Sequence, residues 1–223
     1  AMAVKLMHYW TIIPSSKEAY ADFIIKKFIP GVNRLGMHTV AGWSVLVGSY
    51  SDVIMETVSS DLDQLEDALK THQYRLLKSD LLNLVKNYKT KVMVPIATRG
   101  SYSRSISPST VKFNQLWNVI TLKPGDYRNY EQFVTHEFYP LLEKIGVHLA
   151  GEWEALIGDE PHTICEGRVT DVGALIPALQ GSEFRKAKKK LKQFVENYQS
   201  RILSFHVRKI KGSRYEGYEM IGH

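Results

Sequence analysis

The stretch GMHTVAGWSVLVG (residues 36–48) returns further along the chain as GVHLAGEWEALIG (residues 146–158). Both stretches begin with glycine, carry a histidine two residues later and a tryptophan seven residues later, and end in glycine. Sliding the chain along itself by 110 residues extends this match without a gap, so that residues 6–96 fall on residues 116–206. Self-similarity over such a length predicts two copies of one folding unit.

Each copy predicts the same order of elements, β-α-β-β-α-β. Runs of β-forming residues indicate the strands, and apolar residues at helical spacing indicate the helices. Asp61 and Asp171 are expected to cap a second helical region, which breaks near its middle and ends near Tyr88 and Tyr198. The predicted strands cover residues 6–13, 38–47, 53–59 and 91–96 in the first copy, and 116–122, 148–157, 163–169 and 201–207 in the second.

This order defines the ferredoxin-like unit, whose antiparallel sheet has helices on one face and a bare second face. Two bare faces within one chain can bury each other. The sequence therefore predicts an α+β fold of two tandem ferredoxin-like βαββαβ repeats that form an intramolecular pseudo-dimeric α/β barrel. The predicted divisions are repeat 1 (1–96), a serine-rich linker (97–113), repeat 2 (114–210) and a polar C-terminal tail (211–223).

The composition, 44% hydrophobic and 23% charged, is typical of a soluble globular protein. Cys165 is the only cysteine, which excludes an intrachain disulfide and favours a reducing compartment, so a cytoplasmic location is predicted. No apolar run is long enough to span a bilayer, and no membrane span is expected. The net charge of +6 allows anionic partners, but the basic run RKAKKKLK (residues 185–192) is expected to be a solvated helix face. No nucleic-acid-binding motif accompanies it, so no nucleic-acid partner is predicted.

Motifs that the chain lacks narrow its chemistry further. It contains no P-loop, no dinucleotide-binding G-x-G-x-x-G after a strand, no C-x-x-C, no H-E-x-x-H and no G-x-S-x-G. Their absence argues against nucleotide-driven reactions, structural zinc and the common hydrolases. No cofactor is therefore expected, while a small-molecule ligand and a homo-oligomer both stay open.

The second copy, GVHLAGEWEALIGDEPHTICEGRVTD (146–171) followed by EFR (183–185) and FVENYQSRIL (194–203), resembles a NIPSNAP-type domain. More broadly, both copies resemble the dimeric α/β-barrel superfamily. That superfamily includes cofactor-free monooxygenases, small decarboxylases and dehalogenases, tandem haem proteins akin to chlorite dismutase, and NIPSNAP proteins. The resemblance leaves haem or a divalent metal open, although no haem-ligand signature supports either.

Candidate catalytic residues lie on the second strand of each copy. Alternation predicts that the repeated tryptophans pack beneath the helices, while His38 in one copy, and His148, Glu152 and Glu154 in the other, occupy the opposite face. A histidine near neutral pH and two carboxylates suit proton transfer. The structural alternatives are a histidine bonded to a loop carbonyl, and glutamates paired with Arg168 or with lysines.

Candidate substrate-binding residues are Arg75, Arg185, Glu166 and Arg168. The two repeated arginines lie where the second helical region breaks, and Glu56 and Glu166 are their expected partners. An arginine at such a break can bridge loop carbonyls or can anchor a substrate carboxylate. Both readings stay open.

These observations favour a NIPSNAP-like small-molecule-binding protein with cofactor-independent monooxygenase-type activity in a barrel cavity. That cavity is expected either between a sheet and its helices or between the two sheets, with the second copy as the functional half because its polar face is richer. The alternatives are a non-catalytic protein-interaction scaffold, and a haem or metal enzyme akin to tandem chlorite dismutase-like proteins.

Overall fold

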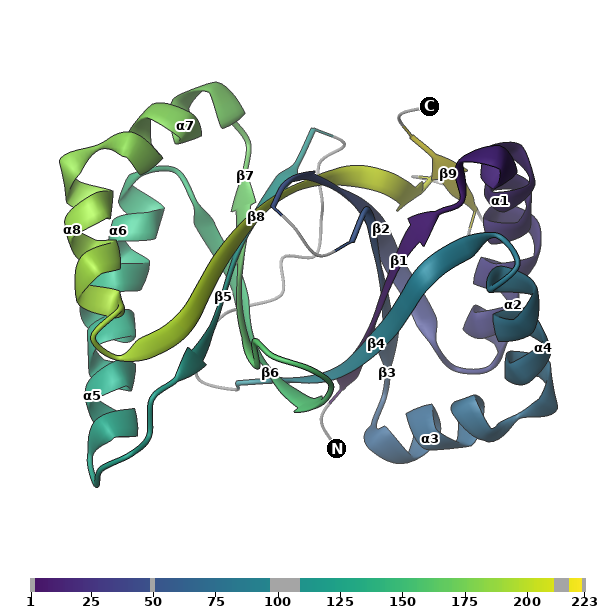
Figure 1. The fold of residues 1–223 in the computed structure, drawn as a ribbon, viewed down its shortest axis with the longest axis horizontal. Coiled ribbons are helices and arrows are strands. Elements are labelled where there is room, and N and C mark those ends of the chain that lie inside the picture. Colours follow the sequence, from purple (N-terminus) through teal and green to yellow (C-terminus); the bar gives the residue numbers. More distant parts are fainter. Residues whose placement is uncertain (1–2, 49–50, 97–108, 211–216, 222–223) are drawn as a thin grey trace.

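The two copies build one closed barrel in which neighbouring strands are antiparallel. The computed structural model describes residues 3–48, 51–96, 109–210 and 217–221. Around the barrel the strands follow the order β2-β3-β1-β4-β6-β7-β5-β8, and pairing of β8 with β2 closes the ring (Figure 1). The strands are β1 (Val4–Ile12), β2 (His38–Val47), β3 (Val53–Ser59) and β4 (Val85–Pro95) in the first half, and β5 (Val111–Val119), β6 (His148–Ile157), β7 (Thr163–Val169) and β8 (Val195–Lys209) in the second.

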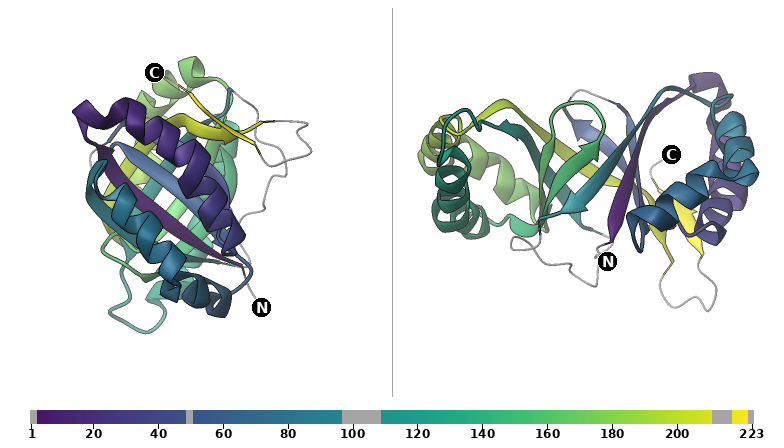
Figure 2. Two further views of the ribbon diagram at one scale, coloured as in Figure 1. Left: turned by 90° about the vertical axis from the view of Figure 1, so that its right-hand side faces the viewer. Right: turned by 90° about the horizontal axis from the view of Figure 1, so that it is seen from below.

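Helices cover the outside of the barrel in two layers, one for each half, at opposite ends of the molecule (Figure 2). This arrangement confirms the predicted pair of ferredoxin-like repeats in a pseudo-dimeric barrel. The first layer contains a 3-10 turn (Pro14–Ser16), α1 (Lys17–Phe23), a π-helical turn (Ile24–Phe28), α2 (Ile29–Arg34), α3 (Leu62–Lys70) and α4 (His72–Leu81); the second contains α5 (Asp126–Phe133), a π-helical turn (Val134–Phe138), α6 (Tyr139–Lys144), α7 (Val172–Gln180) and α8 (Ser182–Leu191).

Aspartate caps begin the second helical region in both halves, as the sequence predicts. Asp61 Oδ1 accepts the backbone N–H of Gln64 at 2.8 Å, and Asp171 Oδ1 accepts that of Ala174 at 3.1 Å. Each bond satisfies one of the backbone donors that a helix N-terminus leaves without an internal partner. The predicted break in this region is also confirmed, since α3 and α4, and likewise α7 and α8, are separate helices.

The gapless alignment of the two copies is wrong in the first strand. Trp10 in β1 donates its indole N–H to Tyr20 (2.9 Å), and Trp117 in β5 makes the same bond to Tyr130 (3.0 Å). The offset between halves is therefore 117 − 10 = 107 in the first strand and 130 − 20 = 110 from the helices onward. Three additional residues between β5 and α5 account for the difference.

Tyr88 and Tyr198 lie in strands β4 and β8, so the prediction that they end helices is wrong. An asparagine with a left-handed backbone precedes each of them, Asn87 (φ 56°) and Asn197 (φ 55°). Each tyrosine ring stacks on the buried tryptophan of its own half, with ring centroids 6.3 Å apart. The two aromatic pairs extend the helix-side core to the ends of these strands.

The C-terminal tail contributes a ninth strand, β9 (Tyr218–Met220), which pairs with the end of β8. Tyr218 is buried in the helix-side core of the first half, so this part of the predicted polar tail belongs to the folded body. The predicted serine-rich linker lies largely outside the described residues, as do residues 211–216. Among the helices that the structure describes, none is long and apolar enough to cross a membrane.

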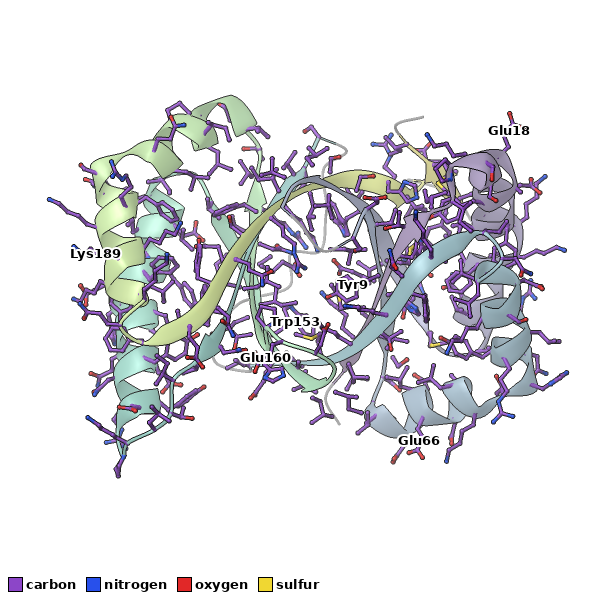
Figure 3. All side chains as sticks on the ribbon, viewed as in Figure 1. Tyr9, Glu18, Glu66, Trp153, Glu160 and Lys189 are labelled. Atoms are coloured by element: carbon purple, nitrogen blue, oxygen red, sulfur yellow. The ribbon has the colours of Figure 1, made fainter. Side chains whose placement is uncertain are left out.

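Three hydrophobic cores follow from these layers: one beneath the helices of each half, and one inside the barrel. Figure 3 shows Tyr9 and Trp153 within the ring of strands, whereas Glu18, Glu66 and Lys189 lie on the outer helices. The barrel core also contains Trp43. The prediction that the repeated tryptophans pack beneath the helices is therefore wrong, because the interior of the barrel is itself a hydrophobic core and takes the apolar face that carries Trp43 and Trp153.

Candidate functional site

Four charged side chains, two from each half, meet inside the barrel. Lys5 Nζ lies 2.9 Å from Glu56 Oε2 and 3.1 Å from Glu166 Oε1, while Lys112 Nζ lies 2.6 Å from Glu56 Oε1 and 3.4 Å from Glu166 Oε1. All four residues are between 1% and 7% exposed. With the corrected offset the lysines are equivalent positions of β1 and β5, and each bridges both halves. We refer to these four residues as the ion ring.

Opposite charges and aromatic rings surround the charged groups of the ion ring. Lys5 Nζ lies 4.1 Å from the ring centroid of Trp153, and Lys112 Nζ lies 4.5 Å from that of Trp43. Burial opposes ionisation of Glu166, but the two ammonium groups outweigh it and lower its pKa to about 2. Burial also opposes the charge on Lys5, yet the two carboxylates raise its pKa above the ordinary range. Lys5, Glu56 and Glu166 therefore carry their charges near neutral pH.

A pocket of about 190 Å³ opens in the second half, between the barrel wall and helix α5. It lies on the helix side of the sheet and shares no residue with the ion ring. A cavity of about 150 Å³ can hold benzene, so this space suits a molecule with one ring. We call it the second-half pocket; its lining residues are Ile96, Asn118, Val119, Thr121, Tyr127, Tyr130, Glu152, Glu154, His162 and Thr163.

A buried carboxylate forms part of this pocket. Glu152 on β6 is 1% exposed, and its Oε1 accepts the hydroxyl proton of Tyr130 at 2.6 Å. The Tyr130 oxygen accepts in turn the indole N–H of Trp117 at 3.0 Å. Burial, reinforced by the nearby carboxylate, raises the pKa of Tyr130, so its hydroxyl stays protonated and orients Glu152. The arrangement holds a fixed proton acceptor against the pocket.

Other polar groups of the pocket come from β5, β6, α5 and the segment before β7. The backbone N–H of His162 donates to Asn118 Oδ1 at 2.8 Å, and this bond joins β5 to the segment before β7 beside the pocket. Tyr127 and Glu154 are exposed and lie where the pocket meets solvent. The pocket thus has a buried end at Glu152 and an open, polar end.

A β-bulge separates His148 from Glu152, although alternation predicts that they share a face. The register shifts between Leu149 and Gly151, which reverses the sides of the residues before and after it. The His148 side chain is 56% exposed, and its Nδ1 lies 3.1 Å from Glu143 Oε1. The structure therefore brings the two predicted glutamates together and places His148 outside the pocket.

The remaining predicted residues also lie away from the second-half pocket. His38 begins β2 in the first half, and Arg75 and Arg185 are exposed on α4 and α8. Glu166 belongs to the ion ring, with Arg168 two residues further along β7. Lysines and not the repeated arginines are thus the ion-pair partners of the repeated glutamates. The substrate-binding roles of these residues stay predictions.

In the first half, the equivalent position is filled by the chain itself. Tyr20, the equivalent of Tyr130, is hydrogen-bonded to His206 Nε2 at 2.8 Å, and the two rings stack with centroids 5.7 Å apart. His206 lies near the end of β8, which pairs with β2 at Gly42. Gly42 is the equivalent of Glu152, and a Cβ there would lie 3.3 Å from a β8 side chain. A buried imidazole therefore takes the place of the carboxylate.

Sequence reasoning missed Tyr130, Asn118 and both lysines of the ion ring. The signal that could have found them is the three-residue shift of the first strand, which aligns the two Trp–Tyr pairs and the two lysines. Asn118 has no counterpart in the first half under either offset, because Thr11 and His8 stand at the matching positions. Among the described residues, no group of three or more His, Cys, Asp or Glu side chains could hold a metal ion.

Solved structures with the same fold match along nearly the whole chain. A monooxygenase candidate from Fusobacterium nucleatum has a TM-score of 0.63 at 9% identity, over 100% of this chain and 96% of that one. An anthrone oxidase-like protein has a TM-score of 0.60 at 10% identity, over 92% and 91%. A chlorite dismutase variant from Candidatus Nitrospira defluvii has a TM-score of 0.53 at 10% identity, over 92% of each chain.

No family model matches the sequence, and no curated protein matches it either. The chain has the dimeric α/β-barrel fold that these structures share. At such low identities the likeness concerns the fold alone.

Proposed function

We propose that this chain is a NIPSNAP-like small-molecule-binding protein that acts as a cofactor-independent monooxygenase-type enzyme in the second-half pocket. The observation that carries the proposal is the buried Glu152 carboxylate, fixed by the Tyr130 hydroxyl at 2.6 Å beside a space of about 190 Å³. Monooxygenase candidates and an anthrone oxidase-like protein share the fold, which supports the reaction class by analogy only.

Glu152 would act as the general base on a phenol-like substrate. Removal of the acidic proton makes the ring electron-rich, so that it can transfer electrons to O₂ without a cofactor. The balanced overall reaction is phenol + O₂ → quinone + water: a ring carbon gains one oxygen atom, and the second oxygen leaves as water. The four electrons that O₂ accepts come from the substrate itself. Tyr130 positions the base and is not consumed.

Oxygen uptake with a panel of one-ring phenols and hydroquinones tests this proposal. General-base catalysis typically contributes about 10²–10⁴-fold, so Glu152→Gln should lower kcat/KM by at least about 100-fold. Glutamine can still accept the Tyr130 hydroxyl, so the melting temperature should change little. Glu18→Gln, on the outer face of α1 (Figure 3), is the control and should keep full activity. Unchanged oxygen uptake in Glu152→Gln would contradict the assignment of the base.

A haem enzyme is the alternative that the chlorite dismutase relatives suggest, and the pocket does not fit this group. Its volume of about 190 Å³ is below even the 300–1,000 Å³ usual for drug-sized ligands, and a haem is larger still. His162 is the lining residue with an imidazole, and it is exposed at the open end. No step of the proposed reaction therefore involves haem.

A non-catalytic scaffold is the second candidate, and the basic face of α8 favours it. Arg185, Lys186 and Lys189 are exposed there with other lysines around them. Such a helix could dock an acidic protein segment. Binding of a poly-glutamate peptide that is lost in Lys186→Glu/Lys189→Glu, together with no oxygen uptake on any phenol, would favour the scaffold over the enzyme.

A further inference from the structure

The helices α7 and α8 of the second half differ in charge from their counterparts α3 and α4. Residues 62–82 include four acidic and three basic residues, whereas the equivalent residues 172–192 include one acidic and six basic residues. The net charges of the two segments are therefore −1 and +5, on a chain whose net charge is +6. Most of the excess positive charge of the protein is thus carried by one pair of helices.

Most basic side chains of α8 have no acidic partner. Of those on this helix, only Lys190 has a carboxylate partner within the parts of the chain that the structure describes, Glu137 at 2.8 Å. Burial and the ammonium group of Lys192 lower the pKa of Lys188, so positive charge is crowded here. The basic residues without an ion pair among the described residues are Arg185, Lys186, Lys188, Lys189 and Lys192.

Helix α7 lacks the exposed charges of its counterpart and presents apolar surface instead. None of its residues is charged, only Leu175 is buried, and Ile176 is 42% exposed. Only Gly181 separates α7 from α8, and the two helices meet at an outer corner of the second helix layer (Figure 1). Where α3 exposes Asp63, Glu66 and Asp67, α7 exposes Gly173, Ile176 and Pro177.

Exposed apolar surface beside a group of lysines is the combination that binds anionic lipid bilayers. Lysine ammonium groups are attracted to a negatively charged headgroup layer, and exposed apolar side chains can enter the boundary between headgroups and acyl chains. A single-stranded nucleic acid would need exposed aromatic rings on which its bases stack, and α7 and α8 expose none.

An acidic protein segment fits this surface less well. Such a segment would gain affinity by burying its anchors in a groove. The shallow groove beside α8 has three lysines in its lining, but two of them already have carboxylate partners, Lys144 with Glu183 and Lys190 with Glu137. The cations without partners lie mainly outside this groove.

We infer that the outer surface of α7 and α8 is a peripheral docking surface for anionic lipid bilayers. The lysines of α8 would lie at the headgroups, and Ile176 of α7 would enter the interface. Docking of this kind needs no membrane-spanning segment. It is independent of the proposed function, because no residue of α7 or α8 lines the second-half pocket.

Co-sedimentation of the full-length protein with lipid vesicles tests this docking. The probes are vesicles of phosphatidylcholine alone and vesicles that also contain about 30% of the anionic lipid phosphatidylserine. We expect sedimentation with the anionic vesicles only. Binding should fall between about 0.1 M and 1 M salt, because the screening length shrinks from about 10 Å to about 3 Å. Equal binding to both kinds of vesicle, or to neither, would overturn the inference.

Charge-removing variants locate the surface. Lys186→Gln/Lys189→Gln should lower the partition onto anionic vesicles at least about tenfold, because each lysine near such a surface contributes about 1 kcal/mol, or about fivefold. Arg75→Gln/Lys78→Gln is the matched control, since it removes two exposed charges from α4, and it should leave the partition nearly unchanged. The melting temperature of both variants should change little. Equal losses of binding in the two variants would overturn the assignment to α8.

Two further measurements separate a bilayer from an acidic protein partner. Ile176→Gln should weaken vesicle binding severalfold, because the exposed apolar side chain adds to the electrostatic attraction. Unchanged vesicle binding in Ile176→Gln would overturn the role of α7. Binding of a poly-glutamate peptide without any partition onto anionic vesicles would overturn the lipid assignment in favour of an acidic protein segment.

Discussion

The two halves of this barrel have the same framework, but the equivalent tyrosine hydroxyl has a different hydrogen-bond partner in each half. In each half a buried tryptophan of the first strand donates to a tyrosine of the first helix, Trp10 to Tyr20 and Trp117 to Tyr130. In the first half the partner of that hydroxyl is His206, from the last strand of the other repeat; in the second half it is Glu152, from the same repeat.

This exchange accompanies a difference in how far the last strand of each repeat extends. The strand β8 has 15 residues and its counterpart β4 has 11, so β8 runs on past Gly42 and carries β9 onto the first helix layer. The Tyr218 hydroxyl donates to the backbone oxygen of Thr39 at 2.8 Å and holds that strand in place. In the second half, β4 is followed by Ile96, which lines the pocket. The duplicated unit thus has an imidazole beside its tyrosine in the first half and a carboxylate beside a pocket in the second.

The largest effect is expected where the halves are equivalent, in the ion ring. Lys112→Met should lower the free energy of unfolding by about 3–5 kcal/mol, because it leaves two buried carboxylates with one ammonium group. Lys5→Met should cost the same, since both lysines bridge both halves. Urea unfolding measures both variants, with the exposed Lys189→Met as control. Very different losses in the free energy of unfolding for Lys112→Met and Lys5→Met would contradict the equivalence of the two lysines.

Acid should destabilise both halves together, because they share these carboxylates. The folded-state pKa of Glu166 is about 2 and that of Glu56 is also lowered, against an ordinary value of 4.5. The stabilisation that they contribute is therefore complete above about pH 4.5 and is lost as the pH falls toward 2. Thermal unfolding followed from pH 6 to pH 2 should show one cooperative transition that moves to lower temperature. Separate transitions for the two halves would contradict the shared ring.

A smaller and more selective effect is expected at the two tyrosines. Tyr20→Phe should lower the free energy of unfolding by about 1–3 kcal/mol, because it leaves the buried Trp10 N–H and His206 without their partner. Tyr130→Phe should cost a similar amount and should also lower kcat/KM by at least about tenfold, since Glu152 loses its orienting donor. Denaturant unfolding measures the stability of both variants, and oxygen uptake measures their activity. A loss of activity in Tyr20→Phe comparable to that in Tyr130→Phe would contradict the assignment of function to the second half.

The smallest effect is expected at His148. Its side chain is exposed and pairs with the exposed Glu143, so His148→Ala should change the free energy of unfolding by no more than about 0.5 kcal/mol. It should also keep its activity on any substrate that Glu152→Gln no longer turns over. Loss of turnover in His148→Ala at an unchanged melting temperature would restore His148 as the base.

The candidate site could be predicted from the sequence only in part. Glu152 and Glu154 are found because polar residues at alternate positions of a strand share a face, and both do line the pocket. His148 is misplaced because the bulge near Leu149 leaves no mark in the alternation itself. Tyr130 is missed because its helical spacing from Phe133, Val134 and Phe138 indicates only a core-facing residue of an amphipathic helix.

The sequence by itself determined the duplication, the order of elements and hence the barrel, because helical and strand periodicity, caps and turns are local properties that a single chain reveals. Only the tertiary structure decided which residues meet: the two lysines and two glutamates of the ion ring, the carboxylate beside Tyr130, and the imidazole beside Tyr20. These contacts depend on strand register and on how far β8 extends past β2. A three-residue shift or a single bulge changes them while the local pattern stays the same.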